Sequence, residues 1–438
     1  MSIWPAARLA EIGTWFGGGT PSKSRLEFWE NGTIPWLSPK DMDSEVLADT
    51  QDHITEAAVE GSATRLVPPN SVAVVIRSGI LERTIPVALV PFTTTLNQDM
   101  KAVAARDGVD PRWIAWGLRA HERELLDTTR KAGTTVASLE YQRFLEFRLP
   151  VPPLQDQRRI VDILEDHLSR LDAAHAASES ARGRLVALED SAIRGVLFPA
   201  SGDANIVRRI VEGERPLLSP GWRWEQLGAL AEVVSGITKD TKKQSDPGLV
   251  EVPYLRVANV QRAHLDLSRI TMIRVRPAVA ETLALRRGDV LMNEGGDRDK
   301  LARGWVWEDQ IPGCIHQNHV HRARPDQTII EPEWLAWCAN TFGARWAQRH
   351  GRQSVNLASI SRSTLLTMPI PVPPLDVQRR ATTSIRTLRE DVARMRHEVD
   401  SSLVRSSSLR RALLAAAFSG GLTGRSSDLD IAEELMPA

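Results

Sequence analysis

An internal repeat restricts the fold of this 438-residue chain more than any other feature of its sequence. Residues 151–159, Val-Pro-Pro-Leu-Gln-Asp-Gln-Arg-Arg, return 221 positions later at 372–380 as Val-Pro-Pro-Leu-Asp-Val-Gln-Arg-Arg. Residues 110–116, Asp-Pro-Arg-Trp-Ile-Ala-Trp, return at 331–337 as Glu-Pro-Glu-Trp-Leu-Ala-Trp. Weaker matches in the same order pair 34–37 with 252–255, 70–73 with 288–291, and Phe198 with Phe418. Collinear matches of this kind predict two copies of one structural plan.

Each copy begins with a mixed region of short β-rich runs, such as residues 71–76 and 288–292. Glycine- and proline-rich turn signals separate these runs. A proline-punctuated stretch follows in each copy, at 149–153 and 368–374. Proline fixes its own backbone and restricts the residue before it, so we expect an extended segment there. Each copy is therefore expected to have a β-rich module followed by an extended segment.

Long helices are predicted after both diprolines, because apolar residues recur there at alternating steps of four and three. A helix from about Leu154 to Leu197 would be about 65 Å long at 1.5 Å per residue. The residues expected in the coiled-coil seam are Ile160, Leu164, Leu171, Leu185, Leu188, Ile385, Leu388, Val392, Met395, Val399, Leu409 and Leu413.

A single amphipathic helix cannot bury such a stripe, and the chain supplies two similar helices. Pairing them with each other is the economical solution, and the module between them in sequence makes an antiparallel pair the expected one. The alternative is that each helix pairs with another subunit. The expected fold class is α+β, with two pseudo-repeated recognition modules separated by two long helices that form an antiparallel coiled coil, and with approximate twofold symmetry.

Composition narrows the functional classes. The chain carries 55 basic and 55 acidic side chains, and this balance argues against a protein that coats nucleic acid non-specifically. A local basic face remains compatible with it. Two cysteines imply no disulfide framework. No run approaches the roughly 18 apolar residues of a membrane span, and the first residues lack the build of a secretory signal. We expect a cytoplasmic protein without a membrane partner.

The chain resembles the specificity subunits of type I restriction-modification systems from Trp4 to about Gly424. The resemblance rests on the twin Pro-Val-Pro-Pro-Leu-x-x-Gln-Arg-Arg helix starts at 150–159 and 371–380. Two further segments add to it: Ala-Ala-Ala-Phe-Ser-Gly-Gly-Leu-Thr at 415–423, and Glu-Gly-Gly-Asp-Arg-Asp-Lys-Leu at 294–301.

In that family each module is a target recognition domain that reads one half of a split sequence in double-stranded DNA. The resemblance implies that the helices space the modules and dock two methyltransferase subunits, and that nuclease-translocase subunits join for cleavage. It implies no cofactor and no catalytic residue in this chain. The expected divisions are the first module at 1–150, a central helix at 151–200, a linker and second module at 201–368, a C-terminal helix at 369–425, and a tail at 426–438.

The residues themselves offer little for catalysis. The diprolines lack the amide or acid before them and the aromatic after them that amino-methyltransferases use to hold a base. Residues 17–23, Gly-Gly-Gly-Thr-Pro-Ser-Lys, lack the ending of a phosphate-binding loop and predict a surface loop instead. The two pairs of tryptophans at 113 and 116 and at 334 and 337 are interpreted as core residues.

Cys314, His316, His319 and His321 are of types that bind zinc. Strand-like alternation from Cys314 to Arg324 would send His319 to the face opposite the others, and no fourth ligand is evident. The segment is therefore interpreted as a polar strand edge that could face DNA, and no metal site is expected.

Candidate DNA-reading residues are polar or basic side chains in loops able to reach a groove. Two pairs of these loops recur in both halves, 17–23 with 236–242 and 130–135 with 349–354. The candidates are Thr20, Ser22, Lys23, Lys40, Arg77, Arg83, Lys131 and Thr134 in the first module, and Thr238, Lys239, Lys242, Arg256, Asn259, Arg298, Lys300, Arg303, Arg352 and Gln353 in the second.

Two other functions fit parts of the pattern. One is a coiled-coil scaffold whose two modules bind protein. The other is a stand-alone modification enzyme, which the missing cofactor and catalytic motifs oppose. A basic face shared by both modules would favour DNA, whereas a large apolar face on each would favour protein.

Overall fold

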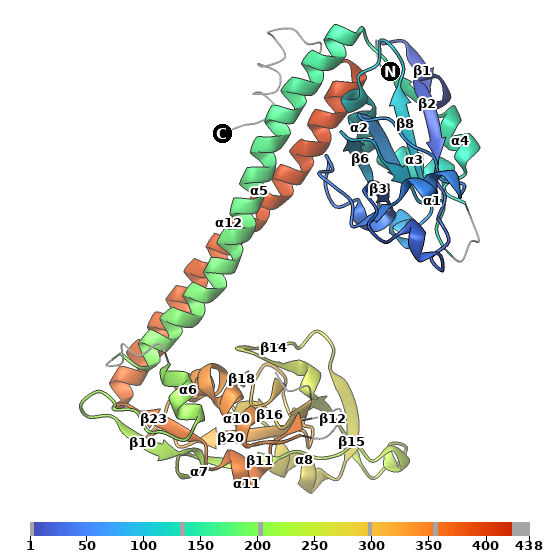
Figure 1. Cartoon of the computed structure of the whole chain (residues 1–438). Helices are drawn as coiled ribbons and strands as arrows, with labels where there is room; N and C mark the ends of the chain where they lie inside the picture. The colour runs from blue at the N-terminus through green and yellow to red at the C-terminus, as the bar shows by residue number, and fades with distance from the viewer. Residues whose placement is uncertain (1–3, 132–135, 200–204, 297–299, 354–357, 423–438) are drawn as a thin grey trace. The chain divides into compact units, whose positions relative to one another are not determined.

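The computed structural model of the chain describes residues 4–131, 136–199, 205–296, 300–353 and 358–422. It confirms the α+β prediction, with two sheet-containing modules and two long helices packed together (Figure 1). The chain divides into two compact units, one made of residues 1–179 and 399–438 and the other of residues 180–398. Each unit contains one module and a part of each long helix.

In the first unit a four-stranded antiparallel sheet, in the order β2-β8-β5-β6, carries the module. A three-stranded sheet β4-β3-β7 and a two-stranded sheet β1-β9 accompany it. The strands are β1 (Ala6–Arg8), β2 (Gly13–Gly17), β3 (Ile34–Leu37), β4 (Asp52–Ile54), β5 (Ser71–Val75), β6 (Val87–Val90), β7 (Thr95–Leu96), β8 (Met100–Ala105) and β9 (Arg148–Pro150). The α-helices of the module are α1 (Glu56–Glu60), α2 (Pro111–Ala120), α3 (Glu122–Thr129) and α4 (Tyr141–Glu146).

Two apolar clusters cover the two faces of the four-stranded sheet, because side chains alternate along a strand. Val72 and Val74 of β5 pack in one cluster with Ile114 of α2. Ala73 and Val75 pack in the other cluster with Leu37 of β3 and Leu96 of β7. Helix α2 and the β3-β7 pair therefore lie on opposite faces, and the residues that follow β7 emerge at the edge of this core.

The second unit repeats the arrangement with a sheet in the order β11-β20-β16-β18, a sheet β15-β12-β19 and a two-stranded sheet β10-β23. Two small sheets, β13-β14 and β17-β22-β21, are added. The strands are β10 (Arg223–Gln226), β11 (Ala231–Ser235), β12 (Val250–Leu255), β13 (Val260–Gln261), β14 (His264–Leu265), β15 (Thr271–Val275), β16 (Val290–Asn293), β17 (Gly295–Gly296), β18 (Gly304–Val306), β19 (Ile315–His316), β20 (Val320–Pro325), β21 (Arg352–Gln353), β22 (Ala358–Ser359) and β23 (Pro369–Val372). The helices of this module are α6 (Ile206–Val211), α7 (Leu227–Leu230), α8 (Pro277–Leu283), α9 (Pro332–Cys338), a π-helix (Ala339–Gly343), α10 (Ala344–His350) and α11 (Arg362–Leu365).

The repeated sequence motifs form the same joint in both units. The indole nitrogen of Trp113 donates to the carbonyl of Pro150, and that of Trp334 donates to the carbonyl of Pro371, at 2.8 Å in each case. All four motif tryptophans are buried, so their interpretation as core residues is confirmed. The indoles thus tie α2 and α9 to the extended segments that precede the long helices.

A buried glutamine at the start of each long helix completes this joint. Gln157 accepts a hydrogen bond from the backbone N–H of Asp110 and donates to the carbonyls of Gly108 and Pro152. Gln378 makes the corresponding three bonds, to Glu331 N and to two carbonyl oxygens, those of Ile329 and Pro373. The glutamine of the repeated Leu-x-x-Gln-Arg-Arg motif therefore provides a hydrogen-bond partner to three backbone groups in each unit.

The long helices are α5 (Leu154–Leu197) and α12 (Leu375–Ser419), and the bounds of α5 confirm the predicted helix. Within the first unit, Ile160 and Leu164 of α5 share a cluster with Leu413 of α12. Farther along α5, the carbonyl of Leu171 accepts a hydrogen bond from Ser406. Residue numbers rise along one helix as they fall along the other, so this part of the pair is antiparallel.

The predicted seam holds at most positions and shifts at two. Ile160, Leu164, Leu171, Ile385, Val392 and Leu413 are buried, and Leu185, Leu388, Val399 and Leu409 are half-buried. Leu188 and Met395, in contrast, are 50% and 41% exposed, so placing them in the seam was wrong.

Charged residues take the inner positions that Leu188 and Met395 were expected to fill. Glu189, one residue beyond Leu188, is half-buried and pairs with Arg389 and Arg396, the latter one residue beyond Met395. An α-helix has 3.6 residues per turn, so a strict seven-residue ladder drifts off its buried face over several turns. The seven-residue pattern selected apolar side chains for this part of the helix pair, whereas the structure has an ion-pair network at these inner positions.

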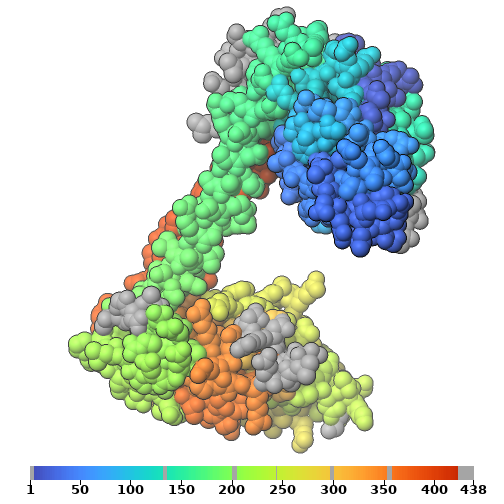
Figure 2. All heavy atoms as spheres, viewed as in Figure 1, coloured from blue at the N-terminus to red at the C-terminus, as the bar shows by residue number. Residues whose placement is uncertain are grey.

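The middle of α5 is open to solvent. Its residues 172–177 are all exposed, and Figure 2 shows this part of the helix at the surface of the molecule. In the described parts of the chain, no helix is long and apolar enough to cross a membrane.

Candidate nucleic-acid interface

A glycine-containing loop lies against the residues that follow β7 in the first module and β19 in the second. The N–H of Gly19 donates to Leu96 O at 2.8 Å, and the N–H of Ile237 donates to His316 O at 3.1 Å. A Cβ on Gly18 would lie 2.0 Å from Asn97 O, and one on Gly236 would lie 1.9 Å from His316 O. Only glycine permits this approach, which explains why both recurring loops begin with it.

A second segment joins each site at the end of the central strand. Ile76 N donates to Asp99 O, and Glu294 N donates to His319 O, each at 2.9 Å. These bonds show that Asp99 and His319 occupy matching backbone positions. They also fix Arg77, the residue after Ile76, as the counterpart of Gly295, the residue after Glu294.

A short β-ladder brings a third segment to the same place. In the first module Arg77 pairs with Ser138, and Lys131 N donates to Ser138 O at 2.9 Å. In the second module Ser359 pairs with both Gly295 and Arg352. Lys131 and Arg352 therefore occupy matching positions, and both are basic and exposed.

In the first module these segments enclose an open cleft of about 880 Å³. Its lining residues come from the second and third segments, from residues 98–99 and from Pro39, and they are Pro39, Ile76, Arg77, Ser78, Gly79, Gln98, Asp99, Lys131, Val136, Ser138, Leu139 and Tyr141. Thr20 donates a hydrogen bond to the amide oxygen of Gln98, which joins the glycine-containing loop to the cleft. Three sequence candidates, Thr20, Arg77 and Lys131, are thus brought together.

The electrostatic balance at the cleft is cationic, with one carboxylate. Arg77 Nε donates to Asp99 Oδ1. The ammonium of Lys101, on the neighbouring β8, lies 4.9 Å from the centre of the Tyr141 ring. Burial raises the pKa of Tyr141 to about 12, so its phenol stays protonated and able to donate at neutral pH. Basic groups, a phenol and an amide are the side chains that contact phosphates and base edges.

The matching site of the second module carries different side chains. His319 Nδ1 lies 2.8 Å from Glu294 Oε2, where the first module has Asp99 and Ile76. Thr238, Lys239 and Lys242 lie exposed in the loop that follows Gly236. Arg256 is exposed next to Val257, whose N–H donates to Gln317. Lys300 and Arg303 are half-buried between β17 and β18, and the backbone of Gln353 lies in β21 beside Arg352.

Asn259 is the one candidate whose environment excludes contact with DNA, so that prediction was wrong. It is buried, its oxygen accepts from Arg256 N, and its amide nitrogen donates to the carbonyls of Asp266 and Arg269. Asp41 in the first module caps Ser38 N in the same way. Asn259 therefore holds the turn after β12 and has no hydrogen-bonding group left for a ligand.

The remaining candidates lie away from the cleft or outside the described residues. Lys40 is next to Pro39 in the chain, but its ammonium pairs with Asp52 at 2.8 Å. Ser22 and Lys23 are exposed farther along the glycine-containing loop. Arg83 follows the 3₁₀ turn Gly79–Glu82 and does not itself line the cleft. Thr134 and Arg298 lie outside the described residues.

The cysteine–histidine segment is not one strand edge, as the sequence suggested. It forms β19 and β20 with a turn between them, and β20 is an interior strand of its sheet. His316 and His321 are buried, and burial lowers the pKa of His316 to about 4. Burial also raises the pKa of the Cys314 thiol to about 12. In the described parts of the chain, no cluster of three or more His, Cys, Asp or Glu residues is arranged to hold a metal.

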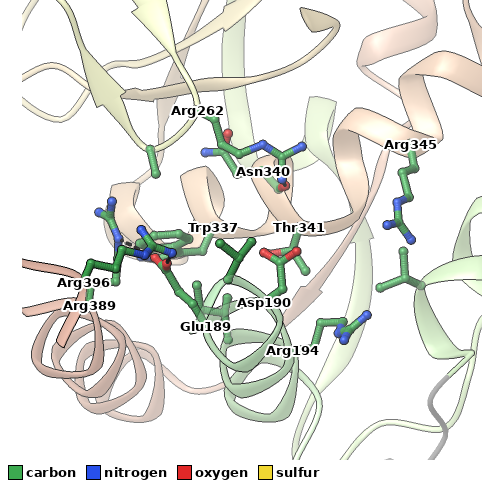
Figure 3. Close-up of a pocket in the computed structure, with 14 residues that line it drawn as sticks. Glu189, Asp190, Arg194, Arg262, Trp337, Asn340, Thr341, Arg345, Arg389 and Arg396 are labelled. Carbon is green, nitrogen blue, oxygen red and sulfur yellow. Dashed lines mark hydrogen bonds and ion pairs between the residues drawn. The ribbon is translucent and has the colours of Figure 1, made fainter. Parts of the chain in front are cut away.

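A smaller cavity of about 300 Å³ lies in the second unit where α5 and α12 meet the module (Figure 3). Glu189 of α5 pairs there with Arg396 and with Arg389, the latter at 3.2 Å. The Arg389 guanidinium also lies 5.2 Å from the centre of a Trp337 ring, and Arg262 donates to the carbonyl of Asn340 at 3.0 Å. The contacts around the cavity therefore connect the two helices to the module.

Sequence reasoning missed several residues of the candidate interface: Gln98, Asp99, Lys101, Ser138 and Tyr141 in the first module, and Glu294, Asn318 and Ser359 in the second. The repeat itself was the signal that could have found some of them. Strand β7 pairs with β3 as β19 pairs with β12, so residues 96–99 correspond to residues 316–319. This match makes Asp99 the counterpart of His319.

Comparisons with known proteins agree with this architecture. A family model described as the type I restriction modification DNA specificity domain matches residues 1–179. The chain is 46% identical over 157 residues to the Escherichia coli EcoR124I/EcoR124II specificity subunit, covering 36% of this chain but only 39% of that subunit. It is 21% identical over 434 residues to the Salmonella potsdam StySPI specificity subunit, covering 96% and 90% of the two chains.

Two solved structures share the fold along nearly the whole chain. One belongs to a study of complex assembly and conformational transition in the type I R-M system, with 19% identity, 96% and 98% coverage and a TM-score of 0.72. The other is the HsdS subunit of Thermoanaerobacter tengcongensis, with 20% identity, 96% and 97% coverage and a TM-score of 0.59. Residues 1–179 thus match the DNA specificity domain of type I restriction-modification systems, and nearly the whole chain is similar to the StySPI specificity subunit in sequence and to these two structures in fold.

Proposed function

We propose that this chain reads a two-part sequence in double-stranded DNA and directs methyltransferase and nuclease subunits to it, without chemistry of its own. Residues 1–150 and 201–368 are assigned as the two target recognition domains. The observation that carries the proposal is the recurrence, in both modules, of a polar site built from the same three segments. A duplicated reader is what recognition of two half-sites requires.

The side chains at these sites are suited to DNA. In the first module Arg77, Lys131 and Gln98 line an open cleft, and in the second Arg352 takes the place of Lys131. Arginine and glutamine can each contact a base edge with two hydrogen bonds, while a lysine neutralises a phosphate. Because the two sites differ at most of their other positions, the two half-sites should differ in sequence.

The long helices are assigned to spacing and assembly. Each is continuous over more than 40 residues, α5 from Leu154 to Leu197 and α12 from Leu375 to Ser419. The exposed stretch 172–177 of α5 and the segment 415–423, of which the structure describes 415–422, are proposed to contact the methyltransferase subunits. Deleting one heptad from each helix should change the number of unread base pairs that the complex tolerates between half-sites.

The test is to co-express the full chain with its neighbouring methyltransferase subunit and to map methylated adenines across the host genome by long-read sequencing. A split motif that appears only when this chain is present would support the proposal and supply both half-sites. A stable complex that leaves no methylation motif would contradict it and favour the scaffold.

A further inference from the structure

Arg77 and Asp99 form a prepared pair at the cleft of the first module. Their backbones are fixed before any ligand arrives, because Ile76 N and Arg77 N both donate to Asp99 O, at 2.9 and 3.3 Å. The N–H of Asp99 donates to the side chain of Asn97 at 2.6 Å. Arg77 is held again by its bridge to Ser138. The two side chains therefore start from defined positions on either side of their hydrogen bond.

The hydrogen bond between them uses only Nε of the guanidinium and leaves its two terminal amino groups. Arg77 Nε donates to Asp99 Oδ1, and no other bond to the guanidinium occurs within the described residues. The side chain of Asp99 is 21% exposed, whereas that of Arg77 is 55% exposed. The carboxylate thus sits behind the arginine, and the two terminal amino groups stay available to a ligand in the cleft. An arginine held this way loses less side-chain entropy on binding.

Two terminal amino groups match one base edge. In the major groove guanine presents two neighbouring acceptors, O6 and N7, which an arginine contacts together. Adenine presents an amino donor beside N7, cytosine an amino donor, and thymine one acceptor beside a methyl group. A guanidinium has donors only, so the other bases leave one of its groups unpaired or opposed.

We infer that Arg77 reads a guanine in the half-site of the first module, and that Asp99 is the positioning residue that holds the guanidinium for it. This inference rests on the proposed function. The second module supplies the contrast, because Gly295 takes the place of Arg77 and His319 the place of Asp99. At its matching position the second module therefore cannot make this contact.

The test uses the full chain in complex with its methyltransferase subunits and duplexes that carry the mapped target. Each guanine of the first half-site is replaced in turn by 7-deazaguanine, which pairs normally but lacks the N7 acceptor. We expect one replacement to weaken binding by about tenfold, the size of one lost bidentate partner. In Arg77→Ala and Arg77→Lys the same replacement should have no further effect. Lysine keeps the charge but cannot contact both acceptors in the same geometry.

Asp99→Asn separates positioning from folding. If Asp99 orients the guanidinium, this variant should lose preference for guanine over adenine at that one position while retaining its thermal stability. Arg123→Ala, on the exposed surface of α3, is the matched control and should leave both base preference and affinity unchanged.

Two results would overturn the inference while leaving DNA recognition intact. The first is a first half-site in which every 7-deazaguanine replacement is neutral. The second is an Arg77→Ala variant that binds all sequences more weakly to the same extent and has a shallower salt dependence, as loss of a phosphate contact would produce. Failure of the proposed function would look different, because no methylation motif would depend on the chain.

Discussion

In the first module Arg77 bonds to Asp99 beside an open cleft, whereas in the second module Gly295 and His319 occupy the same two backbone positions. Around these positions the hydrogen bonds agree residue by residue, from the glycine-containing loops to the ladder that carries Lys131 and Arg352. The comparison teaches that the duplicated backbone is the same at both candidate sites, whereas the side chains at a few matched positions differ. Under the proposed function, these side chains would determine which bases each module recognises.

The joint between module and long helix shows the opposite behaviour, because it is the same in both units. Gln157 and Gln378 make the same three backbone bonds, and Trp113 and Trp334 donate to equivalent proline carbonyls. The residues of the candidate interface differ between the copies, whereas the residues that fix each module to its helix do not.

Replacing either buried glutamine with leucine should destabilise its own unit by about 3 kcal/mol. The change removes the partner of one backbone N–H and two carbonyls. A group that stays buried costs roughly 1–3 kcal/mol, whereas one near the surface, such as the carbonyl of Gly108, can bind water instead. Urea unfolding should report the loss. Hydrogen exchange should localise it to residues 108–116 in Gln157→Leu and to 329–337 in Gln378→Leu.

Gln155→Leu is the matched control, since Gln155 is exposed two positions earlier on the same helix. It should change stability by less than about 0.5 kcal/mol. If Gln157→Leu and Gln378→Leu differed from each other by more than about 1.5 kcal/mol, the equivalence of the two joints would be broken.

Acidification should destabilise the second unit through His316, at a strand position where the first unit has a leucine. His316 is buried, and desolvation lowers its pKa to about 4, whereas Leu96 occupies the matching strand position. The unfolded chain, with a histidine pKa near 6.5, binds the proton more readily than the folded chain. Stability is therefore complete above about pH 6.5 and falls as the pH is lowered towards 4.

The expected loss from His316 is about 2 kcal/mol between pH 7.5 and pH 5. His321, whose pKa burial also lowers, acts in the same direction. Hydrogen exchange at the two pH values, corrected for the intrinsic exchange rate, should show the loss in β19 and β20. The response should shrink in His316→Asn. A second unit whose protection did not change with pH would argue against a neutral, buried His316.

Glu189→Gln should weaken the helix joint of the second unit by about 1 kcal/mol. The carboxylate pairs with both Arg389 and Arg396, but partial exposure of the arginines screens these interactions and keeps the effect small. Thermal denaturation should detect the loss. Asp190→Asn, an exposed neighbour that lines the same cavity, should be neutral. Equal losses in the two variants would mean that general charge, not the ion pairs, stabilises the joint.

The sequence was most informative where the repeat and helical periodicity determine the structure. The start and end of α5 and the burial of Trp113 and Trp334 followed from local pattern. The prediction of the seam was wrong at Leu188 and Met395, because a search for regularly spaced apolar residues cannot detect ion pairs between two helices. Asn259 failed for a similar reason, since a polar residue that caps a turn has the same composition signal as one that reads DNA.

The cleft was harder to predict because its residues come from distant segments. Arg77 lies two residues after β5 and Asp99 directly before β8, and the pairing of these two strands brings them together. Lys131 and Arg352, in contrast, were found because the repeat places a basic residue in both copies of one loop. Comparing matched positions of the two modules thus identifies candidate site residues that the sequence of one module does not reveal by itself.

The smallest predicted effect concerns this shared basic position. Lys131→Ala and Arg352→Ala should each weaken DNA binding to all sequences alike and lower the slope of log affinity against log salt by about one, as expected for one lost phosphate contact. Binding isotherms at four or more salt concentrations provide the measurement, with Arg123→Ala as the unchanged control. A base-specific loss in one of the two variants would show that the ladder position reads sequence in that module. The phosphate contact that both modules share would then have to be made by another residue of the site.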